Sequence, residues 1–331
     1  MRLAVVGAGA IGAYLGARLS LSGHDVSLIA RGPHLRAMQA NGVRVRSPEG
    51  DFEARPVATD DYEEIGEVDF VFLTVKAHGL PEIVPRLLPL LGPETAVLTA
   101  QNGIPWWYFQ KHGGPLEGRR IERLDPDGVV SGAIAADRVI GCIVYPSASI
   151  AEPGVIEHVE GNRFAIGEPD SSTSDRCRRL ADALIESGLR CPIRSRIRDD
   201  MWVKLLGNVA FNPISALTRA TLVEIANHPE ASELARSVMA EADAVAAALG
   251  IKIPISVDQR IAGAAKVGEH KTSMLQDVET GRPMELEAIV GAVIELGEIV
   301  GVQTPNIRAV YAAAKLLGEN VAKQGGVRPA R

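Results

Sequence analysis

Apolar and polar positions follow two different patterns along the chain. In the first 195 residues, short apolar runs are separated by segments whose apolar residues recur at helical spacing. The apolar runs cover residues 3–6, 25–29, 68–75, 95–99 and 139–144. Alternating strands and helices are typical of a parallel sheet with helices on both faces. Residues 1–195 therefore predict a doubly wound α/β domain of the Rossmann type.

Three further elements are predicted inside this domain. Residues 10–21 form an amphipathic helix that stops before Gly23. Residues 42–46 and 51–57 resemble a hairpin around the turn at 47–50. Residues 81–91 predict a helix that leads from the third strand to the fourth.

After about residue 197 the strand pattern stops. Apolar residues at helical spacing predict helices over 201–211, 229–249, 257–268, 284–300 and 306–320. The boundary falls near Pro192, where proline and several arginines interrupt both patterns. Residues 196–331 therefore predict an all-α C-terminal domain, with a polar tail after Asn320 that frays.

Composition excludes several classes of function. The 331 residues include 41 acidic and 35 basic side chains, a net charge of -6, so the chain has no basic excess for nucleic acid. No apolar run approaches the roughly 18 residues of a membrane span, and no signal peptide is evident. Cys142, Cys177 and Cys191 lack the spacing of a zinc site or a disulfide framework. We therefore expect a soluble cytoplasmic protein with reduced thiols.

A glycine-rich loop follows the first apolar run. Gly7, Gly9 and Gly12 have the spacing G-x-G-x-x-G between a strand and a helix. In dinucleotide-binding domains these glycines permit a tight turn, a close approach to the pyrophosphate, and close packing of the helix on the sheet. Amides at the helix N-terminus then face the phosphates. The predicted cofactor loop consists of Gly7, Ala8, Gly9, Ala10, Ile11 and Gly12.

Arg31 follows the second strand, where an NAD-specific site would carry an acidic residue. Its guanidinium can pair with a 2′-phosphate and stack on adenine, which favours NADP(H) over NAD(H). The alternative is a solvated surface arginine.

Two polar residues end the next two strands. Lys76 follows the third apolar run, and Asn102 follows the fourth within Gln-Asn-Gly. Ligands of doubly wound sheets lie beyond the carboxyl ends of the strands. Lys76 and Asn102 are therefore expected on the same rim as the glycine loop, although each could also be an ordinary turn residue.

The helical domain carries a polar stripe. Lys204, Asn208 and Asn212 recur at i, i+4 and i+8, so they share one face of a helix. Pro213 predicts that this helix kinks or ends there. An ammonium and two carboxamides in an apolar segment are costly to bury without polar partners, so a ligand-facing stripe explains them better than a solvated face.

A second polar segment lies farther along the chain. Residues 270–277 include Ser273 and resemble a loop. Glu285 then stands near the start of the next helix, where a carboxylate complementing the helix dipole is the simplest interpretation.

Together these residues carry a resemblance. The loop at Gly7, Arg31, Thr-Val-Lys at Lys76, Gln-Asn-Gly at Asn102, the Lys204 stripe and Lys-Thr-Ser-Met-Leu-Gln-Asp through Ser273 are similar to the 2-dehydropantoate 2-reductase (ketopantoate reductase) family. The match covers nearly the whole chain in the right order.

The resemblance implies a Rossmann domain followed by a helical domain like that of 6-phosphogluconate dehydrogenase. It implies NADPH-dependent reduction of 2-dehydropantoate to (R)-pantoate, on the route to pantothenate and coenzyme A. By position, Lys204 resembles the general acid, and the residues that resemble substrate ligands are Asn208, Asn212 and Ser273. Those that resemble residues where cofactor and substrate meet are Lys76, Asn102 and Glu285.

The chemistry agrees with these roles. Hydride delivery to a 2-oxo carbon creates alkoxide charge, which a positioned ammonium stabilises and protonates. The substrate carboxylate needs donors, which carboxamides and a hydroxyl provide. No metal is required, and no ligand spacing argues for one.

The chain departs from the family at two places. Members have a further substrate-contacting Asn where this chain has Leu222. The segment 104–137 is unusually long and contains the aromatic run 106–109, which suits a lid, a homodimer contact or a satellite core. Two alternatives therefore stay open: a reductase of the same mechanism acting on another 2-oxo acid, and a non-catalytic NADP(H)-sensing module.

Overall fold

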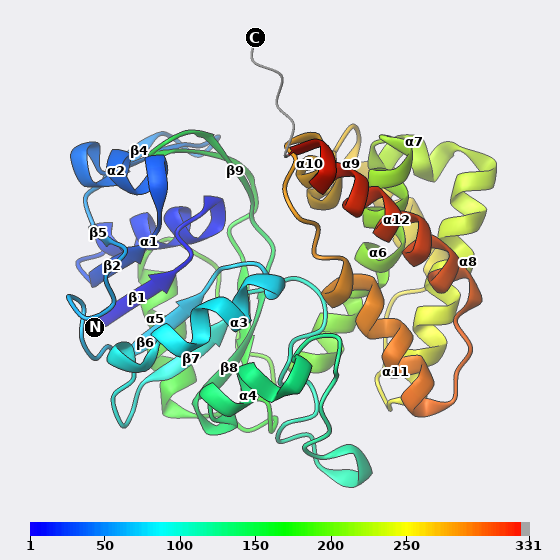
Figure 1. Cartoon of the computed structure of the whole chain (residues 1–331), viewed down its shortest axis with the longest axis horizontal. Coiled ribbons are helices and arrows are strands. Elements are labelled where there is room, and N and C mark those ends of the chain that lie inside the picture. The colour runs from blue at the N-terminus through cyan, green and yellow to red at the C-terminus, as the bar shows by residue number, and fades with distance from the viewer. Residues whose placement is uncertain (326–331) are drawn as a thin grey trace. The chain divides into compact units, whose positions relative to one another are not determined.

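The computed structural model describes residues 1–325 and divides the chain into two compact units. The first comprises residues 1–120 and 125–197, and the second comprises 121–124 and the residues from 198 onward. The first is built on β-sheets and the second is helical (Figure 1). This is the fold class that the two hydrophobic patterns predicted.

The main sheet of the first unit has seven strands in the order β11-β8-β7-β6-β1-β2-β5. All pairs are parallel except β11 with β8. The strands are β1 (Arg2–Val6), β2 (Asp25–Ile29), β5 (Val57–Thr59), β6 (Phe70–Leu73), β7 (Ala96–Thr99), β8 (Val139–Val144) and β11 (Phe164–Gly167). From β1 the chain first adds β2 on one side and later adds β6 on the other. The carboxyl ends of β1 and β6 thus form the point where a doubly wound sheet receives its ligand.

A smaller sheet of the first unit has the strand order β4-β3-β10-β9. Its strands are β3 (Val43–Arg46), β4 (Phe52–Ala54), β9 (Ser147–Glu152) and β10 (Val155–Glu160). Strands β3 and β4 form the predicted hairpin, closed by a bond from the Gly50 amide to the Ser47 carbonyl. Helix α1 (Ala10–Leu21) contacts strands of both sheets and is their shared core element (Figure 1).

The remaining helices of the first unit are short. They are α2 (Gly32–Asn41), α3 (Leu80–Ile83), α4 (Val129–Ala133) and α5 (Asp175–Glu186). The predicted helix over 81–91 is wrong in extent, because α3 ends at Ile83 and 3-10 turns follow over 84–86 and 88–90. The cause is Pro81, Pro85 and Pro89, which remove an amide donor at every fourth residue.

The aromatic run 106–109 belongs to the core of the first unit. Trp107 is fully buried, and its indole Nε1 donates to Oγ1 of Thr99 at 2.8 Å. A Cβ at Gly141 of β8 would lie 2.8 Å from Cη2 of Trp107, so the indole packs directly on that strand. This burial favours the satellite core over a lid or a dimer contact for Trp107.

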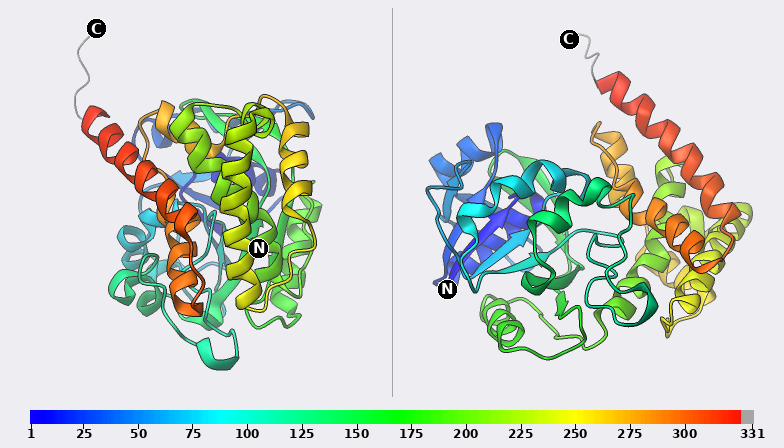
Figure 2. Two further views of the ribbon diagram at one scale, coloured as in Figure 1. Left: turned by 90° about the vertical axis from the view of Figure 1, so that its right-hand side faces the viewer. Right: turned by 60° about the horizontal axis from the view of Figure 1, so that its bottom comes forward.

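The second unit consists of helices packed around α8. They are α6 (Ile197–Thr218), α7 (Leu222–Asn227), α8 (Pro229–Ala248), α9 (Val257–Val267), α10 (Ser273–Glu279), α11 (Ala292–Val300) and α12 (Pro305–Gly325), with a π-helical turn over Glu287–Gly291. Helix α8 contacts α7, α9, α11 and α12 (Figures 1 and 2). The predicted frayed tail after Asn320 is helical through Gly325, and its remainder, 326–331, lies outside the described residues.

Two sequence-based expectations for this unit are wrong in part. The expected helix end at Pro213 is wrong, because helix α6 continues past Asn212 and Pro213 to Thr218, while a kink there stays a prediction. The residues after the proline, such as Ile214 and Ala216, are buried, and this burial offsets the missing backbone bond. The segment 270–277 is a loop only over residues 270–272, because helix α10 begins at Ser273.

Helix α10 begins where it does because of its cap. The Thr272 hydroxyl accepts a hydrogen bond from the Leu275 amide. Met274, Leu275 and Val278 then share one face and are buried, whereas Ser273 is exposed. Asp277 is a buried polar residue of the same helix, and its carboxylate accepts from the Arg282 guanidinium at 3.2 Å.

Candidate active site

The glycine loop between β1 and α1 has the geometry of a dinucleotide-binding turn. Gly7 has φ +97°, and a Cβ there would lie 2.5 Å from Cγ1 of Val75. A Cβ at Gly12 would lie 2.5 Å from Oγ1 of Thr74, so helix α1 packs against the end of β6. The amides of Gly7 and Ala8 donate to the Ile29 carbonyl at 3.1 and 2.8 Å, which fixes the loop to the end of β2.

The start of α1 fits the pyrophosphate of a dinucleotide. Gly9 is the N-cap, and its carbonyl accepts from the Ala13 amide at 2.8 Å. A Cβ at Gly9 would meet its nearest neighbour, the Gly7 oxygen, at 3.9 Å, so the space beside it is open to a ligand within the first unit. The first-turn amides of Ala10, Ile11 and Gly12 precede any helical acceptor. These donors and the positive helix end suit an anion.

Arg31 is the N-cap residue of α2, directly after β2. Its side chain is 87% exposed, and Nη1 lies 3.6 Å from Oε1 of Glu82 on α3. The guanidinium is thus presented to solvent beside the strand end where the adenosine ribose of a dinucleotide lies.

Lys76 and Asn102 lie at the carboxyl ends of neighbouring strands. Lys76 follows β6, and its carbonyl accepts from the Gly79 amide at 2.8 Å. The Gln101 side-chain amide donates to the carbonyls of Leu73 and Val75 at 2.7 and 3.1 Å, which joins the loops after β7 and β6. The structure therefore brings both residues to the edge of the sheet that carries the glycine loop.

The polar stripe of the second unit lies on α6. Lys204 and Asn208 are half-buried, and Asn212 is buried. Pro213 follows within the same helix, so all three residues stay in one helical register.

Ser273 and Glu285 occupy helix starts of the second unit. Ser273 is the exposed first residue of α10, after the Thr272 cap. Glu285 is half-buried, and its carbonyl accepts from the Ile289 amide at 3.2 Å at the start of the π-helical turn. Glu285 therefore stands at the start of this helical segment, where the sequence predicted it.

Leu222, where the chain departs from the family pattern, lies beside the segment that leads to Ser273. Its amide donates to the His270 carbonyl at 3.0 Å, and the Val223 amide donates to the Gly268 carbonyl at 3.3 Å. Leu222 is half-buried at the start of α7. The departure thus falls next to a predicted substrate ligand.

Arg260 of α9 escaped the sequence analysis. A Cβ at Gly207 of α6 would lie 2.5 Å from Arg260 Nη2, so the missing side chain makes room for the guanidinium. Gly207 stands between Lys204 and Asn208, which brings a second cation to the flank of the polar stripe. The available signal was Gly207 itself, since glycine inside a helix marks a close approach.

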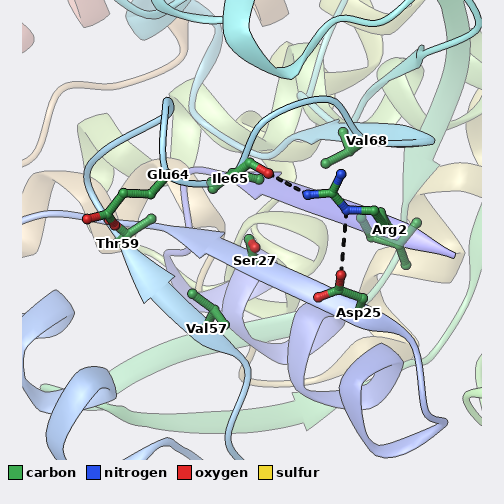
Figure 3. A pocket seen from close by; sticks show the side chains of 9 residues that line it. Arg2, Asp25, Ser27, Val57, Thr59, Glu64, Ile65 and Val68 are labelled. Carbon is green, nitrogen blue, oxygen red and sulfur yellow. Dashed lines mark hydrogen bonds and ion pairs between the residues drawn. The ribbon is translucent and has the colours of Figure 1, made fainter.

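A cavity of about 160 Å³ lies elsewhere in the first unit, among β1, β2, β5 and the segment 64–68 (Figure 3). Arg2 donates to the Ile65 carbonyl at 2.5 Å and lies 3.6 Å from Asp25, while Thr59 donates to Glu64 at 2.8 Å. Arg2 and Asp25 begin their strands, so the cavity extends toward the edge opposite the glycine loop. Its polar groups bind one another, and we assign it a structural role.

Comparison with known proteins decides the family. A model of the ketopantoate reductase PanE/ApbA family matches residues 3–171, and a model of the PanE/ApbA C-terminal domain matches residues 196–318. The chain belongs to the ketopantoate reductase PanE/ApbA family. The candidate site residues described above in the first unit lie within the first match, and those of the second unit lie within the second.

Individual relatives agree with this assignment. A 2-dehydropantoate 2-reductase of Mesorhizobium japonicum is 50% identical over 96% of this chain and 98% of its own length. A Ralstonia solanacearum protein solved as a candidate ketopantoate reductase is 39% identical, with a TM-score of 0.92 and coverage of 97% and 98%. The 2-dehydropantoate 2-reductase of Geobacter metallireducens is 29% identical, with a TM-score of 0.84 and coverage of 96% and 99%. This ketopantoate reductase family member is therefore an oxidoreductase.

Two further features of the described residues bear on the chemistry. Across residues 1–325, no helix combines the length and apolar character needed to cross a membrane. Over the same residues, no three His, Cys, Asp or Glu side chains cluster as a metal site would require. The three cysteines are free and buried, and burial raises the pKa of the Cys177 and Cys191 thiols to about 12.

Proposed function

We propose that the chain is an NADPH-dependent 2-dehydropantoate 2-reductase that forms (R)-pantoate. The proposal depends on one observation: this family member has both a helix N-terminus open to an anion at Gly9 and the polar stripe of Lys204 on α6. The Mesorhizobium enzyme of the same name is half identical over nearly the full length.

In the proposed reaction, bound NADPH supplies the hydride that adds to the 2-oxo carbon. The Lys204 ammonium donates its proton to the former carbonyl oxygen. The C=O double bond thus becomes a C–O single bond, with a new C–H bond on the carbon and a new O–H bond on the oxygen. The same charge stabilises the alkoxide while it develops. Lys204 then regains a proton from solvent, and the products are the 2-hydroxy acid and NADP⁺.

The remaining site residues are proposed to hold the substrates. Asn208, Asn212 and Ser273 offer amide and hydroxyl donors to the carboxylate and hydroxyl of the 2-oxo acid. The residues proposed to line the place where cofactor and substrate meet are Lys76, Asn102 and Glu285.

We further propose that NADP(H) is preferred over NAD(H). Support comes from Arg31, an exposed guanidinium at the end of β2, where an acidic residue would select the unphosphorylated ribose. A cytoplasmic location agrees with the three free thiols. A homodimer stays a prediction.

A second candidate function is reduction of another 2-oxo acid by the same mechanism. The half-buried apolar Leu222 beside the segment of Ser273 favours it, because one polar substrate contact is replaced. The third alternative, an NADP(H) sensor without activity, leaves Lys204 and its neighbours without a role.

One experiment separates the three functions. Purified chain is mixed with NADPH and, in turn, 2-dehydropantoate, pyruvate, 2-oxoisovalerate and phenylglyoxylate, and kcat/KM is measured from NADPH oxidation. We expect the highest value with 2-dehydropantoate. A higher value with another acid supports the second function. NADPH binding without reduction of any 2-oxo acid supports the sensor.

A further inference from the structure

The ion pair between Arg31 and Glu82 joins two segments that lie far apart in the sequence. Arg31 Nη1 lies 3.6 Å from Glu82 Oε1, with side-chain exposures of 87% and 72%. Both residues belong to the first unit. Because both are exposed, a ligand can replace either partner without opening the core.

The strand order puts this pair at the cofactor edge. Strands β2, β1 and β6 are consecutive neighbours in the sheet. Arg31 follows β2, Glu82 lies on α3 after β6, and the glycine loop follows the central strand β1. The pair therefore connects the segments on either side of the glycine loop, at the mouth where the adenosine half of a dinucleotide enters.

The neighbouring cation does not compete for Glu82. Arg86, four residues farther along, donates to the Asp60 carbonyl at 2.9 Å. Its guanidinium also lies 4.6 Å from the centre of the Tyr62 ring. These contacts direct Arg86 toward the segment after β5, while Arg31 is an ion-pair partner of Glu82.

We propose that Glu82 is a specificity residue that competes with the cofactor 2′-phosphate for Arg31. The inference rests on the proposed preference for NADP(H). A 2′-phosphate carries close to two negative charges at neutral pH, as other phosphate monoesters do. To pair with Arg31 it must displace the Glu82 carboxylate and then tolerate that like charge nearby.

NADH meets no such competition, since its 2′-hydroxyl is neutral. Glu82 therefore penalises NADPH selectively and reduces the preference that Arg31 creates. Exposed ion pairs are weak and exchange partners readily, so the effect tunes NADPH binding without abolishing it.

The test is Glu82→Gln, which keeps the shape of the side chain and removes its charge. The matched control is Glu94→Gln, an exposed glutamate that precedes β7 and so lies at the opposite edge of the sheet. Both variants change the net charge equally. Dissociation constants for NADPH and NADH are measured by calorimetric titration at low ionic strength, with Tm as a check on folding.

We expect Glu82→Gln to tighten NADPH binding about threefold to fivefold, the upper range of an exposed ion pair, with NADH changed less than about 1.5-fold. High salt should reduce the gain. In an Arg31→Met background the gain should disappear, because the contested partner is gone. Glu94→Gln should leave both constants at wild-type values.

The inference is wrong if Glu82→Gln behaves like Glu94→Gln, or if it tightens NADPH and NADH equally. It is also wrong if the full gain persists with Arg31→Met. The two proposals can fail separately. If the wild type binds both cofactors equally, the proposed cofactor preference is wrong. If Glu82→Gln still gains NADPH affinity in that case, the competition for Arg31 is supported.

Discussion

The Thr74 hydroxyl donates a 2.8 Å hydrogen bond to the Gly7 carbonyl oxygen and also lies 3.2 Å from the Val6 carbonyl. Thr74 directly follows β6, while Val6 and Gly7 end β1 and begin the glycine loop. One side chain therefore fixes the two strand ends between which the cofactor site forms. The close approach of Gly12 to the same hydroxyl makes this contact part of the packing of α1.

Thr74→Val should weaken both the fold and cofactor binding. The substitution keeps the shape but removes one donor to the part-buried Gly7 carbonyl, which still accepts from the Gly9 amide at 2.6 Å, so we expect a cost of about 0.5–1.5 kcal/mol. We expect a lower Tm and a higher dissociation constant for NADPH. Thr74→Ser, which retains the hydroxyl, should bind NADPH almost as the wild type does. Equal binding by all three proteins would mean that the loop keeps its geometry without this bond.

Arg31→Asp should narrow or reverse the cofactor preference. A carboxylate at this position repels the 2′-phosphate and can accept a hydrogen bond from a ribose hydroxyl. The measurement is kcat/KM with NADPH and with NADH for both proteins. Equal efficiency of the wild type with the two cofactors would remove the role assigned to Arg31.

Lys204→Ala should lower kcat by about 10²- to 10⁴-fold, the usual loss for a general acid. NADPH affinity should stay near the wild-type value, because the proposed phosphate and ribose contacts lie in the first unit. Lys266→Ala, which removes an exposed lysine of α9, is the matched control and should retain full activity. A Lys204→Ala variant with more than about a tenth of wild-type kcat at saturating substrate contradicts proton donation by Lys204.

Leu222→Asn should change the ranking of 2-oxo acids by kcat/KM. Position 222 lies beside the segment that ends at Ser273, so a carboxamide there could reach a substrate hydroxyl. A hydrogen-bond partner gained or lost in a pocket shifts discrimination strongly. Leu222→Met serves as the apolar control. An unchanged ranking in both variants would show that this side chain does not line the pocket.

Glu168→Gln should destabilise the protein more at neutral than at acid pH. Burial raises the pKa of the Glu168 carboxyl, but hydrogen bonds from Arg176 and Ser174 outweigh burial and lower it below its ordinary 4.5. A lowered pKa in the folded state adds stability above pH 4.5, and that stability is lost as the pH falls through the folded value.

At pH 7 the substitution should cost about 1.5–3 kcal/mol of unfolding free energy, typical of hydrogen bonds to a charged group. Urea unfolding at pH 7 and near pH 3 measures the difference between the two proteins. A difference that stays constant or widens toward acid pH would be inconsistent with a stabilising carboxylate at position 168.

The sequence predicted the elements whose signals are local and strong. The bounds of α1 and of β2 coincide with the predicted 10–21 and 25–29, because apolar runs and glycines mark both ends. The order of strands and helices was sufficient for the fold class. The predicted site residues Lys76 and Asn102 could be placed at one edge of the sheet, because the carboxyl ends of parallel strands lie at the same edge.

Prediction from the sequence failed where burial in the folded protein decides whether a helix continues past a proline, and where a helix is short. Pro213 predicted a kink or an end of the helix, but α6 continues beyond it among buried residues such as Ile214 and Ala216. Helix α7 is short, and its one signal was the capping box in which Thr221 and Glu224 bind each other. The approach of Arg260 to Gly207 joins two helices, so Gly207 could mark a close approach but could not identify Arg260 as the partner.

Residues 121–124 are counted with the helical unit although they lie within the sequence of the first. The Glu295 carboxylate accepts the amides of Glu122 and Arg123 at 2.7 and 3.0 Å, and Arg123 binds Glu287 and Tyr311 at 3.0 and 2.9 Å. The polypeptide thus passes between the units three times, at 120/121, 124/125 and 197/198. Neither unit is therefore one continuous segment: a fragment that ends at residue 195 would retain Arg123 but lose Glu287, Glu295 and Tyr311, to which residues 122 and 123 are bound.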